Sequence, residues 1–304
     1  MTSPSSNALG VLAAMAAICI YAGMFAVGRH GGANGLDGFD QTALRFVVSF
    51  LVLVPFAFSR AGGILARLGA WRILTLLVLQ GAVYSFVFLA GLVFAPVAYG
   101  AALVPGLQPF VVMAWSFVLL GEHPGSARLV GLVVCLLGCV CIIFGNMVAL
   151  TAGVGFGIAL FLLSALMWGS YTFLLRYWSV RPMDALLVVG VSSGLLFLPP
   201  YAILAGQSIL VAPWDALALQ VVYQGVLVGI VAVLLMPYAV GRIGSTQVAA
   251  LSPSMPVLAT LFALIALGEN PSVTQWIGIG VVTVGLVVVQ APAALRSLGP
   301  STSL

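Results

Sequence analysis

Several polar side chains that could bind a small molecule lie inside long apolar runs of this sequence. Gln80 and Tyr84 fall four residues apart in the run 73–94, so a helix would place them on one face. Polar groups are costly in hydrocarbon, and those that face a cavity are functional candidates by default. We therefore predict that both side chains line a binding site and form hydrogen bonds with its ligand.

Aromatic side chains form a second set of candidates. Tyr21 and Trp168 lie well inside their apolar runs, and Tyr171 and Trp115 are weaker candidates of the same kind. An amphipathic ring can stack on a substrate and still donate a hydrogen bond. Anchoring at the membrane interface and packing between helices are the alternatives for these rings, and the sequence leaves them open.

Two proline-containing stretches interrupt otherwise helical patterns. The first contains Gln108 and Pro109, and the second contains Met255 and Pro256. Proline removes a backbone donor and leaves a carbonyl one turn earlier without its partner. Inside a membrane such breaks are tolerated where protein or cavity water satisfies that carbonyl. We predict hinges or substrate-contacting bends at the two prolines, with a structural kink as the alternative, and we expect Gln108 and Met255 to line the cavity.

Arg45 is the only charged residue well inside an apolar run. Snorkelling of its long side chain to the membrane interface is one interpretation. Attraction of a substrate carboxylate is the other. Glu122 and Glu269 end their runs at what would be opposite faces of a membrane, where a loop role and a gate are the two alternatives.

The ionisable groups that other functions require are missing from the apolar runs. No Asp, Glu or His lies near the middle of any run, so proton-coupled export of lipophilic cations is disfavoured and a neutral or zwitterionic substrate fits better. No HExxH, GxSxG, paired carboxylates or Ser-His arrangement occurs within them, which argues against an intramembrane enzyme. The four cysteines have no metal-ligand spacing, and we predict no metal and no cofactor.

The elements that must position these side chains follow from composition. Hydrophobic residues make up 63% of the 304 residues and charged residues only 5%, whereas soluble domains carry roughly 25% charged residues. Most of the chain must therefore face hydrocarbon or other helices, and a helix that crosses a membrane needs about twenty mainly apolar residues. The sequence supplies ten such runs: 9–28, 42–58, 73–94, 98–120, 129–144, 154–175, 185–204, 216–240, 247–267 and 273–289.

Charge between the runs orients the chain. If the N-terminus is cytoplasmic, the loops and C-terminus on that side hold eight arginines, and the loops on the other side hold only Arg29. The eight are Arg60, Arg67, Arg72, Arg128, Arg176, Arg181, Arg242 and Arg296. This excess predicts a multi-pass membrane protein with both termini in the cytoplasm. The arginines form no stripe suited to phosphate, so we predict no nucleic-acid partner.

The chain contains an internal repeat. A shift of 147 positions superposes identical residues along the chain. The matched pairs include Arg29 and Arg176, Asp37 and Asp184, Pro109 and Pro256, Gly121-Glu122 and Gly268-Glu269, Gly131 and Gly278, and Gly138 and Gly285. Tyr21 matches Trp168 in the same register, and a shift of three residues around the third run pairs Gln80 with Gln224, which makes Gln224 a candidate near the axis. We divide the chain into repeats 1–147 and 148–304.

Each repeat contains five runs, an odd number, so the second repeat enters the membrane from the opposite side to the first. Inverted repeats place a pseudo-two-fold axis in the membrane plane and a cavity at the repeat interface, the geometry that alternating access uses. The sequence therefore predicts an all-α integral membrane protein of ten helices, in two inverted five-helix repeats around a central cavity. A receptor or a purely structural protein would not need this arrangement.

Two segments of matching pattern stand one in each repeat. They are LQPFVVMAWSFVLLGEHPGSARLVGLVVCLLGCVCII at 107–143 and SPSMPVLATLFALIALGENPSVTQWIGIGVVTVGLVVV at 252–289. Each has a helix with a mid-span proline, a Gly-Glu at its end and a glycine-spaced last helix. This pattern resembles the EamA-type members of the drug/metabolite transporter superfamily, to which the Arg45-Phe46 pair is also similar. The resemblance extends over about 9–289.

The resemblance implies ten helices, a central cavity and transport, often outward, of amino acids or other small metabolites across a bacterial inner membrane. Together with the aromatic candidates it favours an amino-acid exporter similar to aromatic amino-acid exporters. A proton-coupled drug or metabolite efflux carrier is the alternative. The expected partners are a small-molecule substrate and membrane lipid. A monomer would suffice because one chain holds both repeats, and a dimer stays open.

Overall fold

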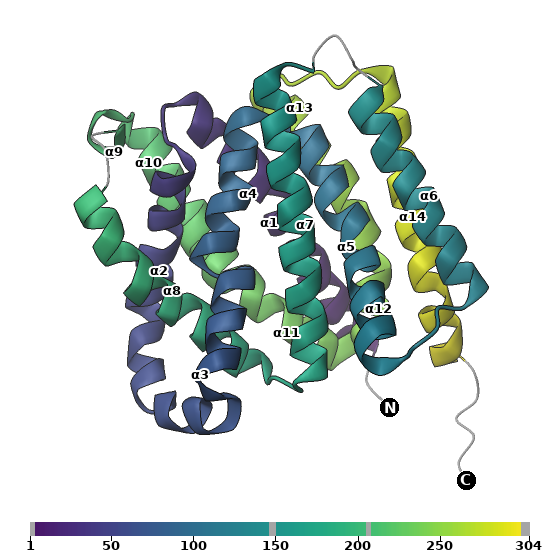
Figure 1. The fold of residues 1–304 in the computed structure, drawn as a ribbon, viewed down its shortest axis with the longest axis horizontal. Coiled ribbons are helices and arrows are strands. Elements are labelled where there is room, and N and C mark those ends of the chain that lie inside the picture. Colours follow the sequence, from purple (N-terminus) through teal and green to yellow (C-terminus); the bar gives the residue numbers. More distant parts are fainter. Residues whose placement is uncertain (1–3, 146–149, 205–207, 299–304) are drawn as a thin grey trace.

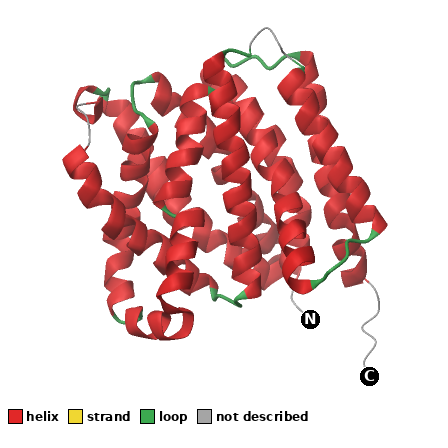
Figure 2. Ribbon diagram, viewed as in Figure 1, coloured by secondary structure: helices red, strands yellow, loops and turns green. Residues whose placement is uncertain are grey.

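The computed structural model describes residues 4–145, 150–204 and 208–298, and this part of the chain is helical with no strand (Figure 1; Figure 2). Ten helical segments among the described residues are long and apolar enough to cross a membrane. The predicted fold of ten membrane-spanning helices is therefore confirmed. The predicted boundary between the repeats, after residue 147, lies outside the described residues.

The described helices follow one another through short loops. They are α1 (Pro4–Ala33), α2 (Gly38–Phe58), α3 (Ala61–Gln80), α4 (Ala82–Phe94), α5 (Val97–Leu120), α6 (Ser126–Phe144), α7 (Ala152–Tyr177), α8 (Pro182–Leu204), α9 (Ser208–Val211), α10 (Trp214–Gln220), η2 (Val221–Ala232), α11 (Val233–Ile243), α12 (Ser245–Leu251), η3 (Ser252–Ser254), α13 (Met255–Leu267) and α14 (Val273–Leu298). The third span joins α3 and α4, the eighth joins α10, η2 and α11, and the ninth joins α12, η3 and α13.

The third span starts earlier than the sequence predicts. We expected it to begin at residue 73, but the helix extends back to Ala61 and reaches 34 residues. A straight helix of that length would measure roughly 50 Å, against a hydrocarbon core of roughly 30 Å. Gly69 breaks it with φ 74° and ψ 159°, and the segment before Gly69 turns along the end of the bundle (Figure 1). Of the arginines that suggested a loop before residue 73, Arg67 lies on the helical segment before Gly69, Arg60 directly precedes that segment and Arg72 follows the break.

A second break in the third span lies at Gly81, between α3 and α4. Its φ of −82° and ψ of −143° end the helix, and the N–H of Ala82 donates to Ser193 Oγ of α8 at 3.1 Å. A Cβ at position 81 would overlap the Leu77 carbonyl and the Ser193 hydroxyl. The corresponding span of the second repeat continues through the π-helical segment η2 instead. Both repeats thus depart from regular α-helix at the same place, where departures often mark functional sites.

Helix packing follows the relation between the repeats. α5 packs on α7 as its counterpart α13 packs on α1, while α2 packs against its own counterpart α8 and α6 against α14. The pair α6 and α14 lies at one side of the bundle, and α2 and α8 lie at the other (Figure 1). Counterparts that pack on each other must lie across the pseudo-two-fold axis, which fits the predicted inverted repeat.

Glycines bring α6 and α14 into backbone contact. A Cβ on Gly138 would lie 2.7 Å from the Val282 nitrogen, and one on Gly285 would lie 2.6 Å from the Cys135 nitrogen. Small residues at such crossings let membrane helices approach closely. The last helices of the two repeats therefore pack against each other.

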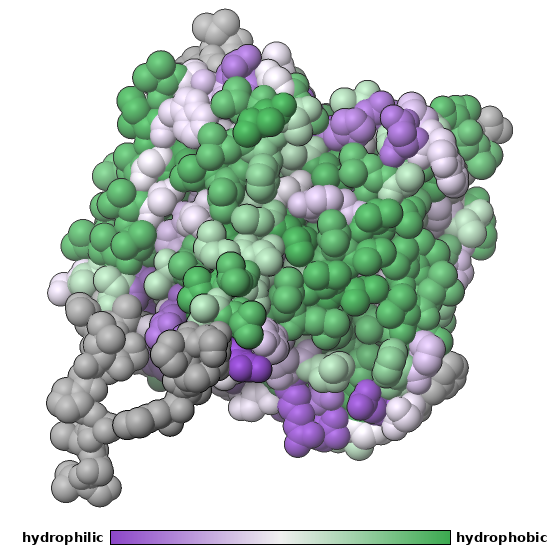
Figure 3. Space-filling model, turned by 180° about the vertical axis from the view of Figure 1, so that it is seen from behind, coloured by the Kyte–Doolittle hydropathy of each residue, from purple (hydrophilic) through white to green (hydrophobic). Residues whose placement is uncertain are grey.

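The outer surface is apolar over a broad band, and hydrophilic residues gather toward its ends (Figure 3). Leu137, Leu195 and Val133 are among the large apolar side chains exposed there. Soluble monomers rarely expose contiguous apolar patches of more than a few hundred Å². Membrane lipid is the environment that such a surface requires, so the chain is a multi-pass membrane protein.

Candidate substrate-binding cavity

A cavity of about 560 Å³ lies between the two repeats. Helices α1 to α5 line it from the first repeat, and α7, α8, η2, α11, α12, η3 and α13 line it from the second. We call the membrane face at which α1 begins and α14 ends the N-face. The lining reaches that face through Leu175 at the end of α7, Pro182 at the start of α8 and Ser245 at the start of α12. Among the described residues, none at a helix end of the opposite face lines the cavity, so it opens toward the N-face.

Eight of the twelve residues predicted to form the site line this cavity. They are Tyr21, Arg45, Gln80, Tyr84, Gln108, Trp168, Tyr171 and Met255. The Gln108 side chain donates from Nε2 to Thr172 Oγ1 at 3.0 Å and so joins α5 to α7. The Tyr84 ring lies parallel to Phe88, with 6.0 Å between centroids. The structure thus brings together side chains from four predicted spans of the first repeat and two of the second.

Trp115 and Gln224 do not line the cavity. Trp115 is 38% exposed, and its indole N–H donates to Ser170 Oγ at 2.9 Å, which holds the ring on the outer surface of α7. Gln224 is fully buried and donates to the Met24 carbonyl at 3.4 Å in the contact between α1 and η2. Its match to Gln80 put Gln224 near the axis, but its side chain bonds to α1 and does not line the cavity.

The predicted proline bends also lie off the cavity lining. Pro109 lies within α5, which continues as a helix past it. Pro256 follows the 3-10 turn η3, where the N–H of Met255 donates to the Ser252 carbonyl that Pro256 cannot reach. The helix break in the ninth span is therefore real, whereas Pro109 leaves α5 unbroken. Neither proline contacts the cavity, and a hinge role for them stays a prediction.

Of the described residues that line the cavity, Arg45 is the only charged one. Its Nη1 lies 3.6 Å from Met24 Sδ, and its guanidinium carbon lies 5.9 Å from the centre of the Phe46 ring. All six Asp and Glu residues of the chain fall in the described part, and the three ion pairs formed there involve other arginines. Arg45 therefore lines the cavity without a carboxylate partner among the described residues, and its binding of a substrate carboxylate stays a prediction beside the snorkelling alternative.

The surroundings of Arg45 combine hydrogen-bonding groups with aromatic walls. Ser49, one turn along α2, also lines the cavity. The amide oxygen of Gln80 has no hydrogen-bond partner among the described residues. Phe25 and Phe88 also line the cavity and add apolar rings to its wall. Such a site can hold an anionic group at Arg45 and a flat apolar group beside it.

Sequence reasoning missed part of the lining. Ser49 could have been found, because it lies four residues after Arg45 and so shares its helical face. Leu186 and Val189 of α8 and Val248 of α12 also line the cavity. These apolar side chains look like any lipid-facing or core residue in the sequence and gave no signal.

Comparison with known proteins places the chain in a family. The EamA-like transporter family matches it twice, over residues 8–144 and 155–290, once in each repeat. The chain belongs to this family. The resemblance found in the two proline and Gly-Glu segments is thereby confirmed, and this EamA-family protein is a membrane transporter of the drug/metabolite transporter superfamily.

Two further similarities agree with the family. An uncharacterised transporter of Archaeoglobus fulgidus is 27% identical to this EamA-family chain over 273 residues, which cover 87% of this chain and 91% of the relative. A solved crystal structure is 22% identical, with a TM-score of 0.63, and the match covers 96% of this chain and 100% of the other. The second similarity shows a common fold alone.

Proposed function

We propose that this EamA-family transporter exports small neutral or zwitterionic metabolites across the inner (plasma) membrane by alternating access, with amino acids, aromatic ones included, as its substrates. The observation that carries this proposal is the Arg45 guanidinium in the cavity without a counter-ion. Placing an unpaired cation away from bulk water is costly. A substrate carboxylate offsets that cost and accepts charge-assisted hydrogen bonds from the guanidinium.

The rest of the lining suits the other parts of an amino acid. The amide oxygen of Gln80 lacks a partner in the described residues, and a turn of this amide would present it to an α-ammonium group. Tyr21, Trp168 and Phe88 supply aromatic surface for the side chain. The cavity of about 560 Å³ falls within the range of roughly 300–1,000 Å³ that small-molecule sites occupy.

The distribution of arginines indicates the direction of transport. By sequence, eight of the ten arginines lie on the N-face, and cytoplasmic loops are the ones enriched in basic residues. The N-face is then cytoplasmic, with both termini there. The cavity opens to this face, which is where an exporter takes up its substrate.

Flux of radiolabelled phenylalanine into proteoliposomes tests the proposal. We expect saturable flux down the phenylalanine gradient, with competition by other amino acids. Phenylalaninamide and phenethylamine lack the carboxylate and should compete at least about tenfold more weakly, because each lost charge-assisted bond contributes roughly 1.5–3 kcal/mol. Equal competition by the amide, or no flux of any amino acid through correctly reconstituted protein, would refute the proposal.

The alternative of proton-coupled efflux is tested in the same vesicles. Among the described residues, the cavity lining contains no Asp, Glu or His that could carry the coupled proton. We therefore expect flux to be independent of an imposed proton gradient. Flux that occurs only under such a gradient would favour the alternative.

A further inference from the structure

Two ion pairs join the repeats in a crossed manner. Arg29 Nε lies 2.9 Å from Glu269 Oε1, and Arg176 Nη2 lies 2.7 Å from Glu122 Oε1. The shift of 147 residues takes Arg29 to Arg176 and takes Glu122 to Glu269. Each pair thus joins the first helix of one repeat to the turn after the fourth helix of the other. The two ion pairs therefore occupy equivalent positions of the two repeats.

The two pairs lie at opposite membrane faces. Arg29 is near the end of α1 and Glu269 follows α13, so both lie at the face away from the N-face. Arg176 is near the end of α7 and Glu122 follows α5, so both lie at the N-face. The glycine before each glutamate has a left-handed backbone, with φ of 65° in one turn and 67° in the other. The same local structure therefore presents the glutamate at each face.

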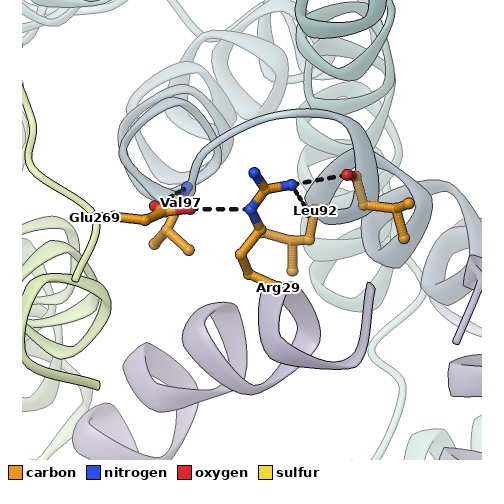
Figure 4. A network of polar contacts seen from close by, with 5 residues as sticks. Arg29, Leu92, Val97 and Glu269 are labelled. Carbon is orange, nitrogen blue, oxygen red and sulfur yellow. Dashed lines mark hydrogen bonds and ion pairs between the residues drawn. The ribbon is translucent and has the colours of Figure 1, made fainter. Parts of the chain in front are cut away.

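The pair at the closed face is docked onto two further helix ends. Arg29 Nη1 donates to the Leu92 carbonyl at 3.1 Å and to the Val93 carbonyl at 2.7 Å, in the last turn of α4 (Figure 4). Glu269 Oε2 accepts from the N–H of Val97, the first residue of α5, at 2.9 Å. These side chains are only 28% and 19% exposed. One ion pair thus holds the ends of α1, α4, α5 and α13 together where the cavity is shut.

The pair at the open face is not docked in this way. In the described part of the chain, the side chains of Arg176 and Glu122 bond only to each other, and they are 64% and 43% exposed. The helix ends that correspond to those of α4 and α5 are the end of α11 and the start of α12. At the second of these ends, Ser245 of α12 lines the open cavity, and among the described residues no side chain caps the start of α12.

We propose that these four residues are the gates of the transport cycle, and that the protein changes its open face by exchanging which pair is docked. In the present state Arg29 and Glu269 close the face opposite the N-face. In the other state Arg176 and Glu122 dock onto the end of α11 and the start of α12, and Arg29 and Glu269 come free. When two inverted repeats exchange their conformations, the closed face opens and the open face closes. The four side chains position helices and do not touch substrate.

A matched pair of isosteric substitutions tests the gates. Glu269→Gln and Glu122→Gln each remove one charge at repeat-related positions, in a protein whose four native cysteines are replaced and whose Ser49→Cys change provides a reporter in the cavity. A membrane-impermeant charged thiol reagent is applied to each side of oriented membrane vesicles, with no substrate present. In the parent protein we expect labelling through the N-face.

Only Glu269→Gln should open the face that is closed in the parent protein. Glu269→Gln should raise labelling through the opposite face by at least about tenfold and lower it through the N-face. The reason is that the charge-assisted contacts of Glu269 stabilise only the state in which the face opposite the N-face is closed. In Glu122→Gln, labelling through the N-face should stay at the parent rate or exceed it. Labelling through the opposite face should stay at the parent rate or fall below it. Shifts of the same sign in both variants, or none in Glu269→Gln, would overturn the proposal.

The design separates gating from folding and from substrate choice. Loss of folding would reduce the yield of monodisperse protein and cannot increase labelling through one face alone. Glu122→Gln alters an exposed side chain, so it is expected to fold. Because no substrate is added, a negative result here leaves the amino-acid proposal standing, and failure of amino-acid flux leaves the gates standing.

Discussion

Replacement of Arg45 by glutamine probes the carboxylate site directly. The guanidinium lines the cavity and has no carboxylate partner among the described residues. A hydrogen bond to a charged group contributes about 1.5–3 kcal/mol, and each 1.4 kcal/mol is about tenfold in affinity. If the guanidinium binds the substrate carboxylate, Arg45→Gln should raise the KM for phenylalanine about ten- to a hundredfold.

The same substitution should not lower the stability of the protein. An uncompensated charge in the cavity opposes folding, so a neutral, shorter side chain should leave the Tm in detergent unchanged or raise it. A side chain that held helices together would give the opposite result. The combination of a higher KM with an unchanged or higher Tm is thus specific to a binding role.

Flux in proteoliposomes and thermal unfolding measure these two quantities. Arg45→Lys keeps the charge but loses the two-pronged geometry of the guanidinium, so its KM should fall between those of the parent and Arg45→Gln. Arg128→Gln changes an exposed arginine at the start of α6 and serves as the matched control. An unchanged KM in Arg45→Gln, or an equal loss of phenylalanine and phenylalaninamide binding, would refute the assignment.

Further substitutions test the cavity wall and the helix packing. Trp168→Ala should raise the KM for phenylalanine severalfold, because it removes an aromatic wall of the cavity. Trp115→Ala changes a ring outside the lining and should leave the KM unchanged. The same flux in both variants would contradict this prediction. Gly138→Ala should lower stability by about 1–3 kcal/mol, because its Cβ would lie 2.7 Å from a backbone nitrogen of α14. Gly280→Ala on α14 should not, because a Cβ there meets nothing within 4 Å, and thermal unfolding compares the two. Gly81→Ala should reduce both Tm and flux, because its Cβ would overlap a carbonyl one turn earlier; a variant with parental Tm would contradict the close contact.

The ten spans could be predicted because the bilayer imposes their length and apolar composition. The sequence failed where a helix leaves the membrane. Arg60, Arg67 and Arg72 suggested a loop, yet α3 begins at Ala61, because a glycine with positive φ at position 69 lets the helix turn along the end of the bundle. Charge alone cannot distinguish a loop from a helix at the membrane surface.

The cavity could be predicted where polarity and helical spacing coincide. Gln80 and Tyr84 share one face of the third span, and both line the cavity. Trp115 shows the limit of this reasoning, because a partner for its indole N–H on α7 keeps the ring outside the lining. The apolar lining from α8, including Val189, depends on tertiary packing that no local pattern in the sequence reports.

Gln80 and Gln224 show why symmetry in the sequence is not symmetry in one structure. The repeat relates the two residues, but Gln80 lines the cavity while Gln224 is buried against α1. The third spans also differ, because the first repeat has a helix break at Gly81 and the second has the continuous π-helical segment η2. The ion pairs differ as well, because the pair at the closed face is docked and the pair at the N-face is not. All three differences lie between repeat-related positions, and two of them lie in the third span of each repeat. A transporter of inverted repeats alternates by exchanging the conformations of its halves, so each half must be able to adopt both. The repeated sequence therefore encodes two conformations, and a single state must place one member of each pair away from its symmetric position.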